Sequence, residues 1–286
     1  MNGNLVYDVG MNNGDDTAYY LHLGYNVVAI EADQKLVEQA VQRFFNHIAD
    51  GRLTILNFAI AEREGVSTFW ICDDNPIWNS FDRSIASRNG ARCHAINVEC
   101  RRFDSVLEEL DVPYYLKIDI EGHDHQCIAA LNAKDLPTYI SFELGPDNIK
   151  SLSVLKKLGF SGFKALSQWN FLPLDRNAFP EKERSKRVLR LAAFINSKAI
   201  IGKVIRKFGG SIYLKNQWEQ VRRSGDWVFP MGSSGSFGPL TIGRWQEYDE
   251  FLDTIHYFQT LFADGAMTPY WPKGSQDLWI DIHARY

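Results

Sequence analysis

The stretch DVGMNNGDDT, residues 8–17, decides how the first part of this sequence folds. It follows the short apolar run LVYDV (5–9) and leads into DDTAYYLHLGY (15–25), where apolar residues recur at helical spacing up to Gly24. Glycine directly after such a segment is a common C-terminal cap of a helix. The sequence therefore predicts a strand, a glycine-bearing loop and a helix, the repeating unit of open α/β sheets.

Beyond this unit, strand-like and helix-like segments alternate to about residue 165. The predicted strands are 27–33, 53–60, 67–72, 96–103, 114–120 and 137–144, and the predicted helices are 35–48, 104–112 (capped by Asp104) and 123–133. Such alternation is typical of a doubly wound, mostly parallel sheet with helices on both faces. We therefore predict a Rossmann-like α/β domain over residues 1–175.

Residues 176–286 lack the regular alternation of strand-like and helix-like segments and are predicted to form a C-terminal α+β extension. They include the basic segment 182–207, the stretch GSSGSFGP (232–239), a helical pattern over 245–262 and the strand-like end WIDIHARY (279–286). Glycine-rich loops have the backbone freedom to close over a ligand. We expect the extension to supply a wall or lid over an acceptor molecule. Its tryptophans suit the faces of sugar rings but also fill protein cores: Trp218, Trp227, Trp245, Trp271 and Trp279.

The composition is that of a soluble globular protein, with 45% hydrophobic residues and a net charge of −4 over 286 residues. A net negative charge gives no general attraction to nucleic acid or to anionic lipid. We see no apolar run long enough to cross a membrane and no secretory signal. The four cysteines form no C-x-x-C pair, so free thiols and a cytoplasmic location are expected.

The glycine loop differs from the loops that bind dinucleotides. Those read G-x-G-x-x-G, whereas Gly10 and Gly14 are four residues apart here. Three carboxylates, Asp8, Asp15 and Asp16, accompany the loop and would repel a diphosphate. They would favour a ligand with an amino group and a sulfonium, which indicates S-adenosylmethionine rather than NAD. The other interpretation is that these acids only cap the helix and complement its dipole.

An acid also ends the second predicted strand, where Glu31 is placed to bind both hydroxyls of an adenosine ribose. The segments DVGMNNGDDT, VVAIEAD, LNFAI, NSF and LKIDIEGHD follow one another in an order and spacing that resembles the FkbM family of S-adenosylmethionine-dependent methyltransferases. The resemblance covers roughly residues 5–165 and implies the class I methyltransferase fold. Two features depart from the family pattern, namely HDH after the glycine and the long C-terminal extension.

The resemblance also implies roles for particular residues. The glycine loop would hold the methionine part of the cofactor, Glu31 the ribose, and the segment after the third strand the adenine, with a serine nearby. In this sequence those residues are Asp8, Gly10, Asn12, Gly14 and Thr17 in the loop region, Asn57 and Ala59 after the third strand, and Ser80.

The stretch YLKIDIEGHDH, residues 115–125, ends a predicted strand in titratable groups. If this strand lies in the same sheet, Asp119 and Glu121 emerge at its carboxyl end beside the cofactor's methyl group. Asp119 is the first candidate for a base or an acceptor-orienting group, and Glu121 and His123 are the second. Metal sites commonly draw ligands from separate elements, so no metal is expected here. Residues 123–125 also fit a solvated helix start, and Lys117 fits an ion pair with a neighbouring acid.

These features together predict a methyltransferase that uses S-adenosylmethionine and acts on a hydroxyl group, with a sugar in a glycan, glycolipid or glycosylated natural product as the expected acceptor. The expected partner is a small-molecule or glycan acceptor and no nucleic acid, with peripheral contact to a membrane or lipid-linked substrate left open. The alternatives are an NAD-linked oxidoreductase, or a non-catalytic module that associates with membranes or proteins through residues 182–207. Asp281 and His283 either reach the acceptor or pack in an ordinary terminal strand.

Overall fold

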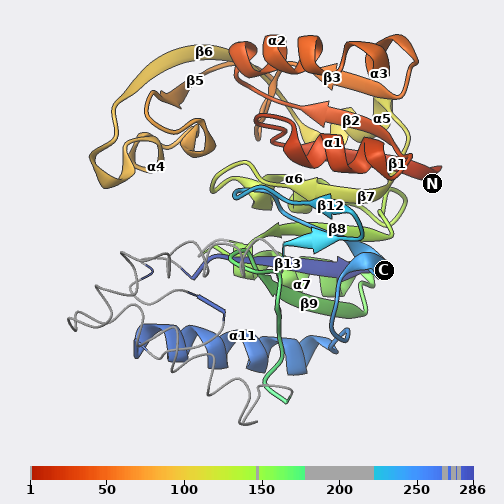
Figure 1. The fold of residues 1–286 in the computed structure, drawn as a ribbon, viewed down its shortest axis with the longest axis vertical. Helices are drawn as coiled ribbons and strands as arrows, with labels where there is room; N and C mark the ends of the chain where they lie inside the picture. Colours follow the sequence, from red (N-terminus) through yellow and green to blue (C-terminus); the bar gives the residue numbers. More distant parts are fainter. Residues whose placement is uncertain (1, 146–147, 178–221, 266–269, 272–274, 276–277) are drawn as a thin grey trace. The chain divides into compact units, whose positions relative to one another are not determined.

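The computed structural model describes residues 2–145, 148–177, 222–265, 270–271, 275 and 278–286 (Figure 1). The chain divides into two compact units, Met1–Ser161 with His283–Tyr286 (unit 1) and Gly162–Ile282 (unit 2). The division falls before the boundary predicted at residue 175. The predicted basic segment 182–207 and Trp218 lie outside the described residues.

Unit 1 is built on a parallel sheet in which the strand order is β8-β7-β1-β2-β3. The strands are β1 (Asn2–Val9), β2 (Asn26–Ile30), β3 (Leu53–Leu56), β7 (Pro113–Ile118) and β8 (Tyr139–Glu143). β1 lies between β2 and β7, although more than 100 residues separate β1 from β7 along the chain. The predicted doubly wound α/β fold is confirmed. The last residues of β13 (Ile280–Arg285) lie next to β8.

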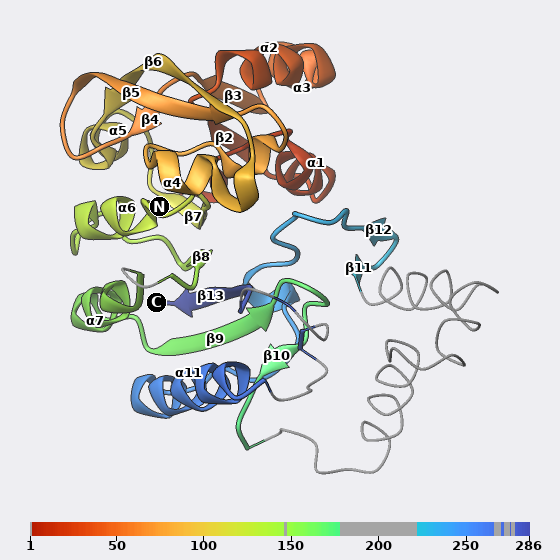
Figure 2. The same cartoon turned by 90° about the vertical axis from the view of Figure 1, so that its left-hand side faces the viewer.

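Helices cover both faces of this sheet (Figure 2). On one face lie α5 (Phe103–Glu109), α6 (Asp124–Ala130) and α7 (Asn148–Leu158), and on the other α1 (Asp15–His22), with α2 (Gln34–Arg43) and α3 (Phe45–Ala49) following β2. The N-cap of α2 is Asp33, whose carboxylate accepts the Lys35 N–H. The prediction that Asp104 caps α5 is wrong, since the helix begins one residue earlier and Asp104 lies in its first turn.

A second sheet of unit 1 has the order β4-β6-β5, comprising β4 (Ala59–Ile60), β5 (Gly65–Cys72) and β6 (Cys93–Arg101). The single strand predicted over 53–60 is therefore wrong. Its two halves belong to different sheets because the Asn57 amide donates to the carbonyls of Glu31 and Ala32 and turns the chain. The antiparallel pair β5–β6 encloses η1 (Pro76–Trp78), α4 (Arg83–Ala86) and η2 (Arg88–Gly90).

Unit 2 has an α+β composition, which agrees with the predicted extension. Its elements are β9 (Gly162–Ser167), β10 (Pro173–Leu174), β11 (Arg223–Ser224), β12 (Trp227–Val228), η4 (Gly238–Leu240) and α11 (Tyr248–Ala263). Residues 233–235 of the glycine- and serine-rich stretch are buried, and a Cβ on Gly235 would meet the Phe171 ring at 2.7 Å.

Aromatic residues of unit 2 serve its packing. Trp271 is buried and packs edge-on against Phe262, and Trp279 packs edge-on against Trp169. Asp281 and His283 of β13 are both buried. Each helix among the described residues is too short or too polar to cross a membrane.

Candidate active site

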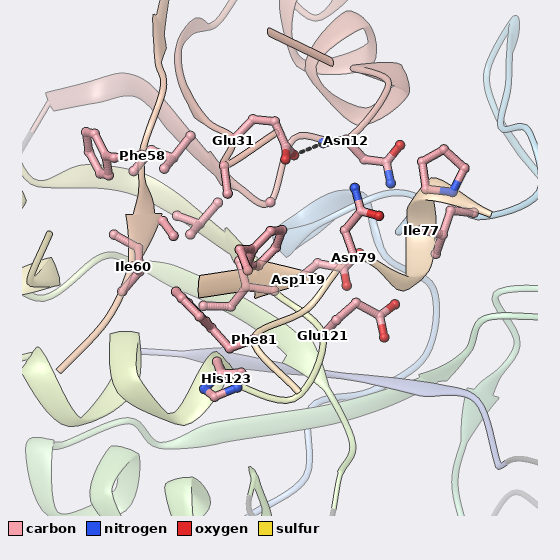
Figure 3. Close-up of a pocket in the computed structure, with 18 residues that line it drawn as sticks. Asn12, Glu31, Phe58, Ile60, Ile77, Asn79, Phe81, Asp119, Glu121 and His123 are labelled. Atoms are coloured by element: carbon pink, nitrogen blue, oxygen red, sulfur yellow. Dashed lines mark hydrogen bonds between the residues drawn. The ribbon is translucent and has the colours of Figure 1, made fainter. Parts of the chain in front are cut away.

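A pocket with about 540 Å³ of empty space, part of it open to solvent, lies beyond the carboxyl ends of β1, β2 and β7 (Figure 3). In open parallel sheets this edge is where ligands bind. Apolar and aromatic side chains form much of the lining, and polar groups line the rest. The main apolar residues are Ile30, Phe58, Ala59, Ile60, Phe69, Ile77 and Phe81, and the polar ones are Asn12, Glu31, Asn79, Asp119, Glu121 and His123.

The glycine loop fits so closely under the end of β7 that its first residue must lack a side chain. Gly10 has φ +83°, and a Cβ built on it would lie 1.8 Å from the Asp119 carbonyl oxygen. Gly14 has φ +79°, and its Cβ would meet the Phe44 ring at 2.6 Å. Both predicted loop glycines are thus required by backbone conformation and by close approach.

Four backbone N–H groups of this loop are already used by the protein. Those of Gly10 and Met11 donate to the Ile30 carbonyl at 2.9 and 3.0 Å, and that of Asn12 donates to Glu31 Oε2 at 2.8 Å. The Gly14 N–H donates to the Met11 carbonyl at 3.0 Å. A diphosphate binds such loops through free N–H groups, so this loop is unsuited to a dinucleotide for a reason of geometry.

The charge argument made from the sequence needs correction, because the acids near the loop are compensated by cations. Asp8 is fully buried and forms an ion pair with Lys117 at 2.9 Å. Asp15 forms an ion pair with Arg43, also at 2.9 Å. Asp16 is buried, 3.9 Å from Lys117. The loop therefore carries much less net negative charge than its sequence indicates.

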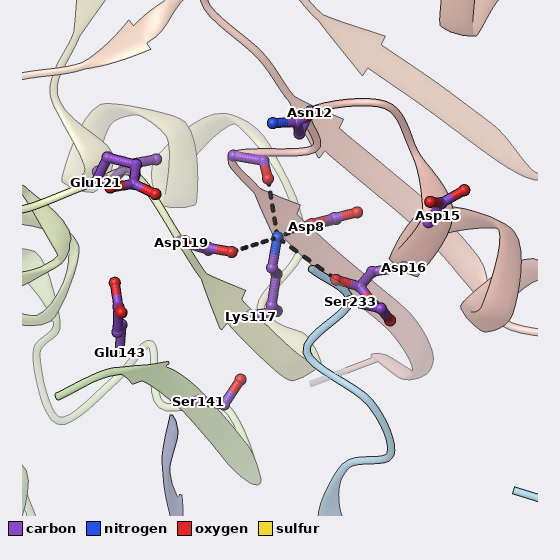
Figure 4. A network of polar contacts seen from close by, with 12 residues as sticks. Asp8, Asn12, Asp15, Asp16, Lys117, Asp119, Glu121, Ser141, Glu143 and Ser233 are labelled. Carbon is purple, nitrogen blue, oxygen red and sulfur yellow. Dashed lines mark hydrogen bonds and ion pairs between the residues drawn. The ribbon is translucent and has the colours of Figure 1, made fainter. Parts of the chain in front are cut away.

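Lys117 is the centre of this network (Figure 4). Its ammonium donates to the Gly10 carbonyl at 2.8 Å and lies 3.7 Å from Asp119 Oδ2, in addition to its ion pair with Asp8. The attraction of these acids holds the pKa of Lys117 well above its usual value in spite of burial. The Thr17 hydroxyl donates to the second oxygen of Asp8 at 2.6 Å. The predicted ion pair of Lys117 with an acid is confirmed.

Glu31 stands at the end of β2 with its carboxylate at the pocket wall. One oxygen accepts the Asn12 N–H at 2.8 Å and the other accepts the Asp33 N–H at 2.9 Å. Each oxygen keeps a further lone pair, which leaves the carboxylate able to accept two more hydrogen bonds. Burial raises the pKa of Glu31 to about 7, against the opposing effect of the two N–H groups.

Asp119 and Glu121, which line the pocket, form a cluster of carboxyl groups with Glu143. Ligand oxygens of Asp119, Glu121 and Glu143 lie within 4.8 Å of one another. Burial, with a further contribution from Asp119, raises the pKa of Glu121 to about 8. Arg88 forms an ion pair with Glu121 at 3.2 Å, and Lys117 neighbours Asp119. These two cations offset part of the negative charge of the cluster.

Glu143 was missed in the sequence, although the signal was present: it ends a strand in acid, as Glu31 ends another. β7 ends at Ile118, two residues before the end of the predicted strand 114–120, and Glu121 beyond it has φ +46°. His123 lines the pocket and packs edge-on against Phe81, with ring centroids 5.3 Å apart. Burial and the neighbouring His125 lower the pKa of His123.

The prediction that residues 123–125 are solvated is wrong for Asp124, which is 1% exposed. Its carboxylate accepts the Ile120 N–H at 2.9 Å and the Glu143 N–H at 3.3 Å. Burial, with the charge of Asp119, raises its pKa to about 7. Asp124 therefore ties the ends of β7 and β8 together, which local periodicity does not indicate.

Several residues predicted to contact a cofactor lie behind the pocket wall instead of in it. The Ser80 hydroxyl is buried and donates to the Glu121 carbonyl at 2.9 Å, while its neighbours Asn79 and Phe81 line the pocket. Ala59 lines the pocket, whereas Asn57 turns the chain beside it. Gly10, Asn12 and Glu31 line the pocket. The other residues predicted for the loop region do not line it: Asp8, Gly14 and Thr17.

The sheet order and the pocket at its carboxyl edge define a Rossmann-like protein of the class I methyltransferase fold. Residues 8–169 match the methyltransferase FkbM domain, which is more than half of the 286 residues. The chain belongs to the FkbM methyltransferase family, and the resemblance read from the sequence is confirmed.

Known proteins are similar to parts of the chain. A 56-residue stretch is 38% identical to the probable ribosomal RNA small subunit methyltransferase A of Methanospirillum hungatei JF-1, and spans 20% of this chain and 22% of that protein. The FkbM methyltransferase structure from Methylobacillus flagellatus KT is 17% identical with a TM-score of 0.38, over 54% of this chain and 37% of that one. The StiE O-MT structure (residues 942–1257) is 7% identical with a TM-score of 0.39, over 99% of this chain and 67% of that one.

Proposed function

We propose that this chain binds S-adenosylmethionine in the pocket of unit 1 and transfers its methyl group to a hydroxyl oxygen. The observation that carries the proposal is Glu31, whose carboxylate faces the pocket with two uncommitted lone pairs beside apolar walls. Vicinal ribose hydroxyls need an acceptor of this kind at the end of the second strand. The aromatic lining, with Phe58 and Phe81, suits a planar adenine.

The polar side of the pocket is suited to bind a cationic group. The cofactor supplies an electrophilic methyl group on a positively charged sulfur. Asp119 and Glu121 lie at the end of β7 where that charge would be located, and Gly10 lets the loop come close. The residues present therefore fit the cofactor at its ribose, its ring and its charged end.

Asp119 is the residue we propose to orient the acceptor hydroxyl and to remove its proton. Its side chain is 35% exposed, so an acceptor can reach it, and Lys117 holds it at 3.7 Å. Glu121 is less suited to be the base, because its raised pKa of about 8 leaves its carboxyl protonated near neutral pH.

For the acceptor we propose a sugar, free or lipid-linked, which the family resemblance also favours. Asp119, Glu121 and Glu143 would offer several hydrogen-bonding oxygens at one point, as a molecule with adjacent hydroxyls requires.

Calorimetric titration with S-adenosylhomocysteine at pH 8.5 tests the proposal. Wild type should bind in the micromolar range, and Glu31→Gln should bind about tenfold or more weakly, since a hydrogen bond to a charged group contributes about 1.5–3 kcal/mol. Glu38→Gln, an exposed glutamate on α2, is the matched control and should bind as wild type does. Binding of NADH, or no binding of S-adenosylhomocysteine by wild type, would refute the proposal.

A second variant separates chemistry from binding. Asp119→Asn keeps the shape of the side chain but lacks a base. With a sugar acceptor in hand, its turnover number should fall at least about a hundredfold, the usual contribution of a general base, while its affinity for S-adenosylhomocysteine, whose sulfur is uncharged, changes little. Unchanged turnover would remove Asp119 from this role.

A further inference from the structure

The hairpin of β5 and β6 places two free cysteines directly opposite each other. Cys72 pairs with Cys93 in the antiparallel register, and both thiols are free. The next pair outward is hydrogen-bonded, since the Asp73 N–H donates to the Arg92 carbonyl at 2.9 Å. Because bonded and non-bonded pairs alternate, the cysteines form a non-hydrogen-bonded pair.

This kind of pair brings side chains together on one face of the sheet. The Cys72 N–H confirms the assignment, since it points away from β6 and donates to Asn79 Oδ1 at 2.9 Å. Directly opposite residues in a non-hydrogen-bonded pair have Cα atoms about 4.5 Å apart. Disulfides accept Cα separations of about 4.4–6.8 Å. A side-chain rotation is therefore enough to join the two sulfurs.

The two cysteines differ in exposure in the way that exchange chemistry needs. Cys93 is partly exposed, so a small oxidant can reach it, whereas Cys72 is 1% exposed and is protected from direct attack. The remaining two cysteines are buried elsewhere: Cys100 lies in the core cluster on the other face of the hairpin, and Cys127 lies in α6.

We propose that Cys72 and Cys93 are a modification site that forms a reversible disulfide by exchange with a low-molecular-weight disulfide such as oxidised glutathione. The Cys93 thiolate attacks one sulfur of that disulfide, which forms a mixed disulfide and releases one thiol. The Cys72 sulfur then displaces the second thiol from Cys93. The protein loses two electrons and two protons, and the small disulfide becomes two thiols.

The new bond would close a loop that carries one wall of the pocket. The segment between the cysteines contributes Pro76, Ile77, Asn79 and Phe81 to the lining. Asn79 accepts the Cys72 N–H and donates to Asp33 at 3.3 Å. Closing a loop of about 20 residues restricts the unfolded chain, which should raise the Tm of the oxidised protein by roughly 5 °C.

The test incubates the full chain with oxidised glutathione, alkylates free thiols under denaturing conditions and identifies linked peptides by mass spectrometry. Two of the four thiols should be lost, with a peptide linking Cys72 to Cys93 that dithiothreitol releases. Cys100→Ala should behave like wild type. Cys72→Ser should stop at glutathione on Cys93 and lose the Tm increase, and Cys93→Ser should not react.

Two results would overturn the proposal. One is the survival of all four thiols in wild type, and the other is glutathione that remains on Cys93 in wild type with no linked peptide. Both results are measured in the wild-type protein, so neither depends on the folding of a variant. Neither depends on the proposed methyl transfer.

Discussion

Replacing Lys117 by methionine tests the charge balance beneath the candidate site. The side chains of Lys117 and Asp8 are 3% and 0% exposed, and they form an ion pair at 2.9 Å. Removing one partner of a buried pair leaves the other charge uncompensated, which costs about 3–5 kcal/mol of the free energy of unfolding. Methionine is similar in length to lysine and fills the same space, so the substitution leaves little cavity to add to this cost.

Urea unfolding followed by far-UV circular dichroism measures this loss. The double variant Asp8→Asn/Lys117→Met should regain at least about 2 kcal/mol over Lys117→Met alone, because asparagine carries no charge and still accepts the Thr17 hydroxyl. Lys157→Met, an exposed lysine on α7, is the control and should change stability by less than about 0.5 kcal/mol.

Two results would contradict the reasoning about Lys117. A loss below about 1 kcal/mol in the single variant would mean that the buried pair is solvated or dispensable. A double variant no more stable than the single one would mean that Asp8 is not the group left uncompensated.

Two further changes probe the loop and the acid cluster. Gly10→Ala should abolish binding of S-adenosylhomocysteine, because its Cβ would lie 1.8 Å from the Asp119 carbonyl oxygen. Gly24 also has a positive φ, but a Cβ there would meet no atom within 4 Å. The control Gly24→Ala should therefore lose only about 1 kcal/mol of the free energy of unfolding and bind normally. Burial raises the folded-state pKa of Glu121 from 4.5 to about 8. The stability contributed by the protonated form is complete below about pH 4.5 and is lost as the pH rises towards about 8. Urea unfolding at pH 6 and pH 8 should therefore show a smaller loss in Glu121→Gln than in wild type, and equal losses would contradict the assignment.

The elements of unit 1 were predictable because their signals are local. Strands and helices follow from periodicity, and the glycine loop from its spacing and its place between a strand and a helix. Glu31 was predictable for the same reason, as an acid at a strand end. Gly10 and Glu31 therefore stood out from the sequence, and both reach the pocket.

What the sequence did not reveal depends on pairing between distant strands. Asp8 lies beside Lys117 because β1 pairs with β7 in one particular register, and nothing near either residue indicates it. Glu143 joins the cluster only because β8 lies next to β7. The break at Asn57 was also invisible, since a strand that changes sheets keeps the same apolar pattern on both sides.

The corrected charges change the reason for which the pocket is proposed to bind a sulfonium. Burial raises the pKa of Glu31 to about 7 and that of Glu121 to about 8, so near neutral pH these carboxyls are largely or partly protonated. A cation beside Glu121 would favour its ionised form, and its attraction would offset the cost of burying that negative charge. A diphosphate would favour the protonated forms and would find the N–H groups of Gly10, Met11 and Asn12 already donated. The proposed selection for a positively charged ligand would thus rest on titratable groups and a closed loop together.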